Sequence, residues 1–115
     1  MPKTYATITA HVLARDLAEG RVAEFWNVLA EEYFEGQMIP GSRRVPVDVV
    51  ARETITTGLA KDTPIVTYCS GPTCPNSGQA AAKLVTLGFT NVRAFEGGVE
   101  EWQASGRAIE QLAGV

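Results

Sequence analysis

Continuous apolar runs in the sequence predict strands, and one run is much stronger than the others. Residues 65–68 (Ile-Val-Thr-Tyr) follow a proline and precede a stretch rich in glycine and proline, which is typical of a buried strand. Weaker runs predict four more strands, at residues 7–8, 23–29, 44–47 and 91–95. Pro46 cannot donate a backbone hydrogen bond, so the run that contains it is expected at the edge of a sheet.

Apolar residues spaced three and four apart predict helices between these strands. The clearest helix covers residues 77–87, with Gly88 ending it in the left-handed conformation and Ser77 capping its first turn. Weaker patterns predict helices at residues 10–19, 31–36, 49–57 and 99–105. Strands that alternate with helices of this length predict an α/β fold, in which a mostly parallel sheet carries helices on both faces.

Size and charge narrow the classes of protein that this fold could serve. The chain has 115 residues, 45% hydrophobic and 20% charged, which fits one folded domain covering residues 1–115. The net charge of −3 and a single basic doublet, Arg43-Arg44, speak against a nucleic-acid partner. We expect both arginines to be solvated. No run approaches the ~20 apolar residues of a membrane span, and no secretory signal is recognisable. We therefore expect a cytoplasmic protein without a membrane partner.

Cys69 is the residue best placed for chemistry. It ends the strongest strand, and ligand sites in parallel α/β sheets lie at the carboxyl ends of the strands. The backbone N–H groups of the following loop and the dipole of the next helix are expected to favour its thiolate form. Gly71 and Gly78 are expected to give the loop the backbone freedom that it needs to curl around the sulfur.

Three other kinds of site are excluded by the residues around this cysteine. One histidine and two cysteines cannot supply the four ligands of a structural zinc site. No lysine follows Gly78, so the loop is not a phosphate-binding P-loop. A cysteine phosphatase needs an arginine six residues after its cysteine, whereas Pro75 and Ala80 stand at those positions after Cys69 and Cys74. We expect neither a metal nor a cofactor.

A set of short segments, correctly ordered along the chain, points to a known family. In the second half of the chain they lie at residues 65–69, 80–84, 87–92, 95–102 and 105–106. Upstream they lie at residues 31–33 (Glu-Glu-Tyr), 39–42 (Ile-Pro-Gly-Ser) and 45–46. Together these segments resemble the rhodanese-like domain family. The resemblance covers about residues 8–109, the expected core of the domain, and implies a three-layer fold around a mostly parallel five-stranded sheet.

The resemblance implies a sulfurtransferase. Cys69 would be the catalytic nucleophile, taking a sulfur atom from thiosulfate or a persulfide and passing it from its own persulfide to cyanide or another thiol. Neither metal nor cofactor is implied, and we expect a monomer whose partners are these small molecules. The backbone of the loop would cradle the anionic sulfur; the residues assigned to this cradle are Ser70, Gly71, Thr73, Cys74, Asn76, Ser77 and Gly78.

The chain departs from the family pattern in two places. The loop from Cys69 to Ser77 is about two residues longer than usual and contains no lysine or arginine, while Pro72 and Pro75 each remove an N–H donor. Binding of the thiosulfate dianion should therefore be weak, and a persulfide or a small neutral donor should suffer less. Asn27 and Leu29 stand where the family often has an aspartate and an arginine, so the usual ion pair is not expected there.

Cys74 leaves alternatives open. It is five residues after Cys69 and could be a passive loop residue, a second sulfur acceptor or a resolving thiol that forms a disulfide with Cys69. The last of these would make the protein a thiol-disulfide redox enzyme, resembling a reductase. A third possibility is a rhodanese-like binding or regulatory module without catalysis, which the uncharged loop favours.

Overall fold

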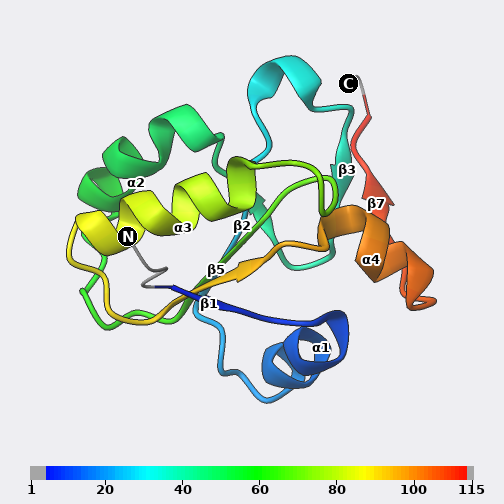
Figure 1. Ribbon diagram of the computed structural model, residues 1–115, viewed down its shortest axis with the longest axis horizontal. Helices are drawn as coiled ribbons and strands as arrows, with labels where there is room; N and C mark the ends of the chain where they lie inside the picture. Colours follow the sequence, from blue (N-terminus) through cyan, green and yellow to red (C-terminus); the bar gives the residue numbers. More distant parts are fainter. Residues whose placement is uncertain (1–4, 114–115) are drawn as a thin grey trace.

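The centre of the fold is a parallel sheet of five strands (Figure 1). The computed structural model describes residues 5–113. Every pair of neighbouring strands in the sheet is parallel. The strand order is β1 (Ala6–Thr7), β6 (Val92–Phe95), β5 (Ile65–Tyr68), β2 (Glu24–Asn27) and β4 (Arg43–Arg44). The strongest strand of the sequence, β5, thus occupies the middle of the sheet, where it is buried from end to end.

Helices cover both faces of this sheet, as the alternating pattern predicts. Figure 1 shows α2 and α3 on one side and α1 and α4 on the other. Their bounds are α1 Ala10–Ala18, α2 Val50–Thr57, α3 Asn76–Thr86 and α4 Gly98–Ala104. Two hydrophobic clusters result: Leu84 of α3 belongs to one, and Leu13 of α1 and Trp102 of α4 belong to the other. The fold therefore has three layers with the sheet in the middle.

Two segments differ from the sequence-based expectation. The run at 44–47 is a strand only at its start, because Pro46 opens a 3-10 turn, η2 (Val47–Val49), that leads into α2. The helix expected at 31–36 is a single 3-10 turn, η1 (Glu31–Tyr33). A second sheet was not predicted: β3 (Gln37–Met38) pairs antiparallel with β7 (Glu110–Gln111). Strands of two residues carry too little pattern to be recognised in a sequence.

Helix α3 ends as predicted and begins differently. Gly88 has φ +100°, and the N–H of Phe89 donates to the carbonyl of Leu84 at 3.1 Å, which closes the helix in the expected left-handed cap. The expectation that Ser77 caps the other end is wrong. Helix α3 begins one residue earlier, and the buried Ser77 hydroxyl has no hydrogen-bond partner. Its carbonyl instead accepts a bond of 2.9 Å from Thr67 of β5.

Candidate active site

Cys69 directly follows β5, and helix α4 holds the backbone around it. The N–H of Val99 donates to the carbonyl of Cys69 at 3.0 Å, and the N–H of Glu100 donates to the carbonyl of Ser70 at 2.9 Å. These are N–H groups of the first turn of α4, which have no partner inside their own helix. Only 1% of the Cys69 surface is exposed. The cysteine is therefore fixed at the expected strand end, but deep beneath the surface.

Gly98 makes this packing possible, and the sequence pattern did not single it out. Its φ is +57°, and a Cβ atom there would run into the carbonyl of Cys69 and approach the nitrogen of Gly71 to 2.9 Å. Any other residue would push α4 away from the Cys69 backbone. The pair Gly97-Gly98 after a strand was interpreted as a simple turn. A close approach between segments distant in sequence leaves no local signal that could have corrected that interpretation.

The two glycines of the loop are needed for space, not for an unusual backbone. Neither Gly71 nor Gly78 has a positive φ, so the expectation based on backbone freedom is wrong for both. A Cβ on Gly71 would lie 2.6 Å from Oε2 of Glu100, and one on Gly78 would lie 2.7 Å from Oη of Tyr5. The loop is thus packed closely between side chains from other elements, and the carboxylate of Glu100 lies against its backbone.

The surroundings of Cys69 favour the neutral thiol. Its Sγ donates to the carbonyl of Cys74 at 3.5 Å. Burial raises the pKa of Cys69 to about 11, and the neighbouring Cys74 thiol raises it further, while the N–H and hydroxyl of Ser77 act in the opposite direction. The expectation of a thiolate in the resting protein is therefore wrong, because loss of hydration outweighs the donors that reach the sulfur. Pro72 and Pro75 have no N–H to contribute.

A small cavity adjoins Cys69, and we call it the inner cavity. It has a volume of about 40 Å³ and lies between Cys69, Leu29, Tyr33, Phe34 and Val99. A water molecule occupies roughly 30 Å³ in the liquid, so this space suits one added atom of similar size. One extra sulfur on Cys69 would fit, whereas a whole thiosulfate ion would not.

Cys74 lies near the surface between two larger hollows. One, the outer groove, has a volume of about 480 Å³ and is formed with Leu29, Tyr33, Ser70 and Asn76. The other, the back groove, has about 530 Å³ and continues over α3 and Glu96. Cys74 is half-buried, and both cysteines are free thiols. The two sulfur-bearing residues thus face spaces of very different size.

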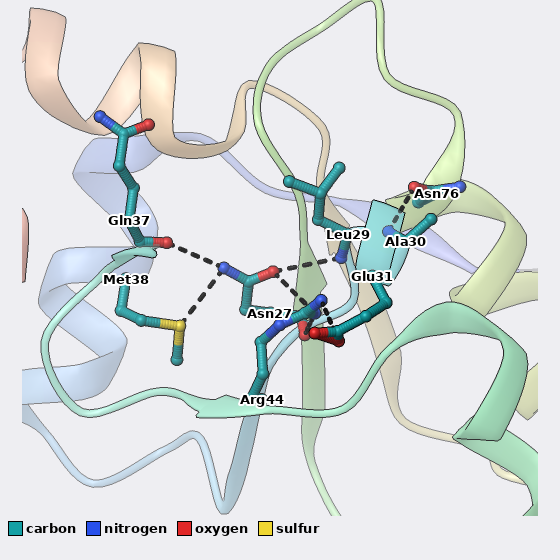
Figure 2. A network of polar contacts seen from close by, with 8 residues as sticks. All are labelled: Asn27, Leu29, Ala30, Glu31, Gln37, Met38, Arg44 and Asn76. Carbon is teal, nitrogen blue, oxygen red and sulfur yellow. Dashed lines mark hydrogen bonds and ion pairs between the residues drawn. The ribbon is translucent and has the colours of Figure 1, made fainter. Parts of the chain in front are cut away.

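Asn76 ties the loop to the segment that follows β2. Its Oδ1 accepts the N–H of Ala30 at 2.9 Å (Figure 2). The same oxygen faces Sγ of Cys74 at 3.6 Å, and its amide nitrogen donates to Gln79 at 3.0 Å. Of the expected loop residues, Asn76 therefore acts through its side chain. Thr73 lies exposed at the edge of both grooves.

A neutral amide replaces the ion pair of the family on the floor of the inner cavity. Oδ1 of Asn27 accepts the N–H of Leu29 at 3.1 Å and a bond from Arg44 at 3.4 Å (Figure 2). Its amide nitrogen donates to the carbonyl of Gln37 at 3.1 Å and to Sδ of Met38 at 3.4 Å. Asn27 thus holds together the walls of the inner cavity without a charge of its own.

The two arginines of the basic doublet are not the solvated pair that was expected. The side chain of Arg44 is 17% exposed, its guanidinium lies 4.0 Å from the centre of the Phe34 ring, and burial lowers its pKa. Arg43 forms ion pairs with Glu24 and Glu53. Among the described residues that line the inner cavity and both grooves there is no lysine or arginine, whereas Glu35 and Glu96 belong to the lining.

Two further searches covered residues 5–113. No group of three or more histidine, cysteine, aspartate or glutamate residues in this range could hold a metal ion. No helix in the same range combines the length and the apolar character required to cross a membrane.

Comparison with known proteins agrees with this geometry. The family model of the rhodanese-like domain matches residues 9–105. The chain therefore belongs to the rhodanese-like domain family. Among curated proteins, none matches it.

Solved structures place it with proteins of the same fold. The BH2092 protein of Bacillus halodurans is 30% identical, with a TM-score of 0.79 over 95% of this chain and 79% of that one. The rhodanese-like domain of the Alr3790 protein from Anabaena is 26% identical, with a TM-score of 0.77 over 97% and 81%. The human single-domain sulfurtransferase TSTD1 is 23% identical, with a TM-score of 0.70 over 85% and 95%, a likeness of fold.

Proposed function

We propose that this protein is a single-domain sulfurtransferase in which Cys69 carries sulfur as a persulfide. The observation that supports this most is the position of Cys69 at the carboxyl end of the central strand, beside a cavity of about 40 Å³ that suits one more sulfur atom. Membership of the rhodanese-like family and the likeness to a sulfurtransferase fold agree with it. In this proposal the protein acts as a cytoplasmic monomer on small molecules, without metal, cofactor, nucleic acid or membrane.

The proposed reaction has two steps that mirror each other. Cys69 attacks the outer sulfur of a donor persulfide, R–S–SH; a bond forms between the two sulfurs, the R–S to outer-sulfur bond breaks, and R–SH leaves with the proton of Cys69. The outer sulfur, now on Cys69, is then attacked by an acceptor thiol or by cyanide, and Cys69 recovers its proton. No net oxidation or reduction of the protein occurs.

The charges near the loop favour a persulfide donor over thiosulfate. A dianion needs cationic or N–H partners, but the walls of the inner cavity and the grooves carry Glu35 and Glu96 and no described cation. Glu100 lies against Gly71 and adds to the repulsion. A neutral persulfide avoids this penalty and places only its outer sulfur in the inner cavity.

Mass spectrometry of the loaded protein tests this proposal. The protein is incubated with glutathione persulfide, desalted and digested, and we expect one additional sulfur atom retained on the peptide with Cys69. Cyanide should release that sulfur as thiocyanate. The Cys69→Ser variant should retain none after desalting. A wild-type protein that retains no sulfur on Cys69 would exclude the proposal.

The raised pKa of Cys69 supports a second candidate, a rhodanese-like binding or regulatory module without catalysis. A buried neutral thiol is a weak nucleophile until it loses its proton. The two candidates differ in the loading experiment, because a binding module leaves Cys69 unmodified at every donor concentration.

A further inference from the structure

The two cysteines of the loop have complementary access, and this difference suggests a division of labour. Cys69 is buried beside a cavity for a single atom, whereas Cys74 is half-exposed on the wall of the outer groove. Building on the proposed sulfur transfer, we propose that Cys74 is a second catalytic thiol, through which sulfur enters and leaves Cys69. Cys69 stores the sulfur atom, and Cys74 exchanges it with large donors and acceptors.

The inner cavity and the outer groove form one path. Both are lined by Leu29, Tyr33 and Ser70, so they meet at these residues. A donor such as a glutathione-sized persulfide can be placed in about 480 Å³ but not in about 40 Å³. Its carrier group therefore stops in the outer groove, where the thiol that it meets belongs to Cys74.

The loop brings the two sulfurs close enough for direct exchange. Sγ of Cys69 bonds to the carbonyl of Cys74 at 3.5 Å, and the turn between them is closed by the N–H of Cys74 donating to Gly71 at 3.0 Å. The Cys74 thiol contributes to the raised pKa of Cys69 through a side-chain contact. On its other side Cys74 faces Oδ1 of Asn76, an acceptor that holds this thiol at the groove.

The exchange balances without an outside oxidant or reductant. Cys74 first takes the outer sulfur of R–S–SH and releases R–SH. Sγ of Cys69 then attacks that sulfur, the bond between it and Sγ of Cys74 breaks, and the electron pair and the proton of Cys69 pass to Cys74. The result is a Cys69 persulfide and a Cys74 thiol. Delivery to an acceptor runs in reverse, and a buried Cys69 keeps its proton until the Cys74 sulfur is there to accept it.

Rapid trapping of three proteins tests this exchange. Wild type, Cys74→Ser and Cys69→Ser are mixed with glutathione persulfide, quenched with an alkylating reagent at increasing times and mapped by mass spectrometry. In wild type we expect sulfur on Cys74 before Cys69. In Cys69→Ser it should appear on Cys74 and be lost on desalting. In Cys74→Ser the loading of Cys69 should slow by roughly tenfold or more, because the positioned exchange partner is missing.

A smaller donor serves as the internal control. Hydrogen disulfide has no carrier group, so it can approach Cys69 without help, and its loading of Cys74→Ser should remain within about twofold of wild type. Thr56→Ala, an exposed change on α2, controls for substitution as such and should load like wild type with both donors.

Three results would overturn the exchange. The first is an unchanged rate for Cys74→Ser with glutathione persulfide, and the second is no trapped sulfur on Cys74 in Cys69→Ser. The third is release of sulfide with loss of two hydrogen atoms from loaded wild type, which would show a Cys69–Cys74 disulfide and a redox enzyme. Absence of sulfur from Cys69 in wild type with either donor would instead exclude the proposed sulfur transfer itself.

Discussion

The inner cavity and the outer groove are built around the same side chain but give it opposite properties. Around Cys69, a central strand, the first turn of α4 and the Asn27 network exclude water and raise the pKa of the thiol to about 11. Around Cys74, an exposed loop with two prolines leaves the thiol at the edge of open hollows. Five residues of chain separate a protected sulfur from an accessible one, so burial and not residue type decides which role each can have.

The largest effect is expected from closing the inner cavity at Gly98. Gly98→Ala adds a methyl group against the backbone of Cys69 at a φ of +57°. Backbone strain and overpacking together should lower the free energy of unfolding by about 4 kcal/mol, as measured by urea denaturation. Gly106→Ala is the matched control, because Gly106 has φ +85° but no atom within 4 Å of the added carbon. It should lose only about 1 kcal/mol; equal losses would contradict the packing role of Gly98.

The second effect concerns pH and separates the buried cysteine from the rest of the molecule. Folding raises the pKa of Cys69 to about 11 from an unfolded value of ~8.5. Its contribution is fully present below the unfolded pKa and is lost as pH rises through the folded one. Relative to Cys69→Ser, wild type should therefore lose up to about 3 kcal/mol of unfolding free energy between pH ~8 and pH ~11. Parallel stability curves for the two proteins would show that Cys69 is not desolvated.

A charge placed on the outer groove should change the preferred donor. Thr73 is exposed at the edge of both grooves, and Thr73→Lys adds a cation where the lining has none. We expect kcat/KM for thiosulfate to rise by about fivefold, mainly through KM, and the gain to fall with added salt. Thr73→Gln, similar in length but neutral, should show no gain. A gain in both variants would mean that charge does not limit the use of thiosulfate.

The smallest effect is expected where the groove is tied to the segment after β2. Asn76→Ala removes the bonds to Ala30 and Gln79 and the oxygen that faces Cys74. It should cost about 1 kcal/mol of stability and increase the alkylation rate of Cys74 more than that of Cys69. Gln79→Ala keeps the bond to Ala30 and should change neither rate. Equal increases at both cysteines in Asn76→Ala would remove the distinction between the two regions.

The sequence predicted the frame of the site because that frame is set by local patterns. The buried run at 65–68, the glycine cap after α3 and the alternation of strands with helices are each visible within a few residues, and they are enough to place Cys69 at a strand end. Family resemblance then connects these separate patterns, and the match to residues 9–105 confirms it.

The electrostatics and the packing of the site could not be predicted in the same way. The raised pKa of Cys69 depends on the volume closed off by β2, η1 and α4, which are distant in sequence. Gly98 was missed for the same reason, since only the fold shows what a side chain there would meet. Ser77 was assigned to a helix cap by residue type, but the helix begins before it.

The small sheet of β3 and β7 has a consequence for the order in which the protein matures. Gln37 and Met38, which hold the Asn27 amide beside the inner cavity, pair with Gln111 and Glu110. During synthesis at ~5–20 residues per second, this pairing must wait until the last of the described strands has left the ribosome. The central strands can assemble earlier, so the storage place for sulfur is among the last parts of the nascent domain to close.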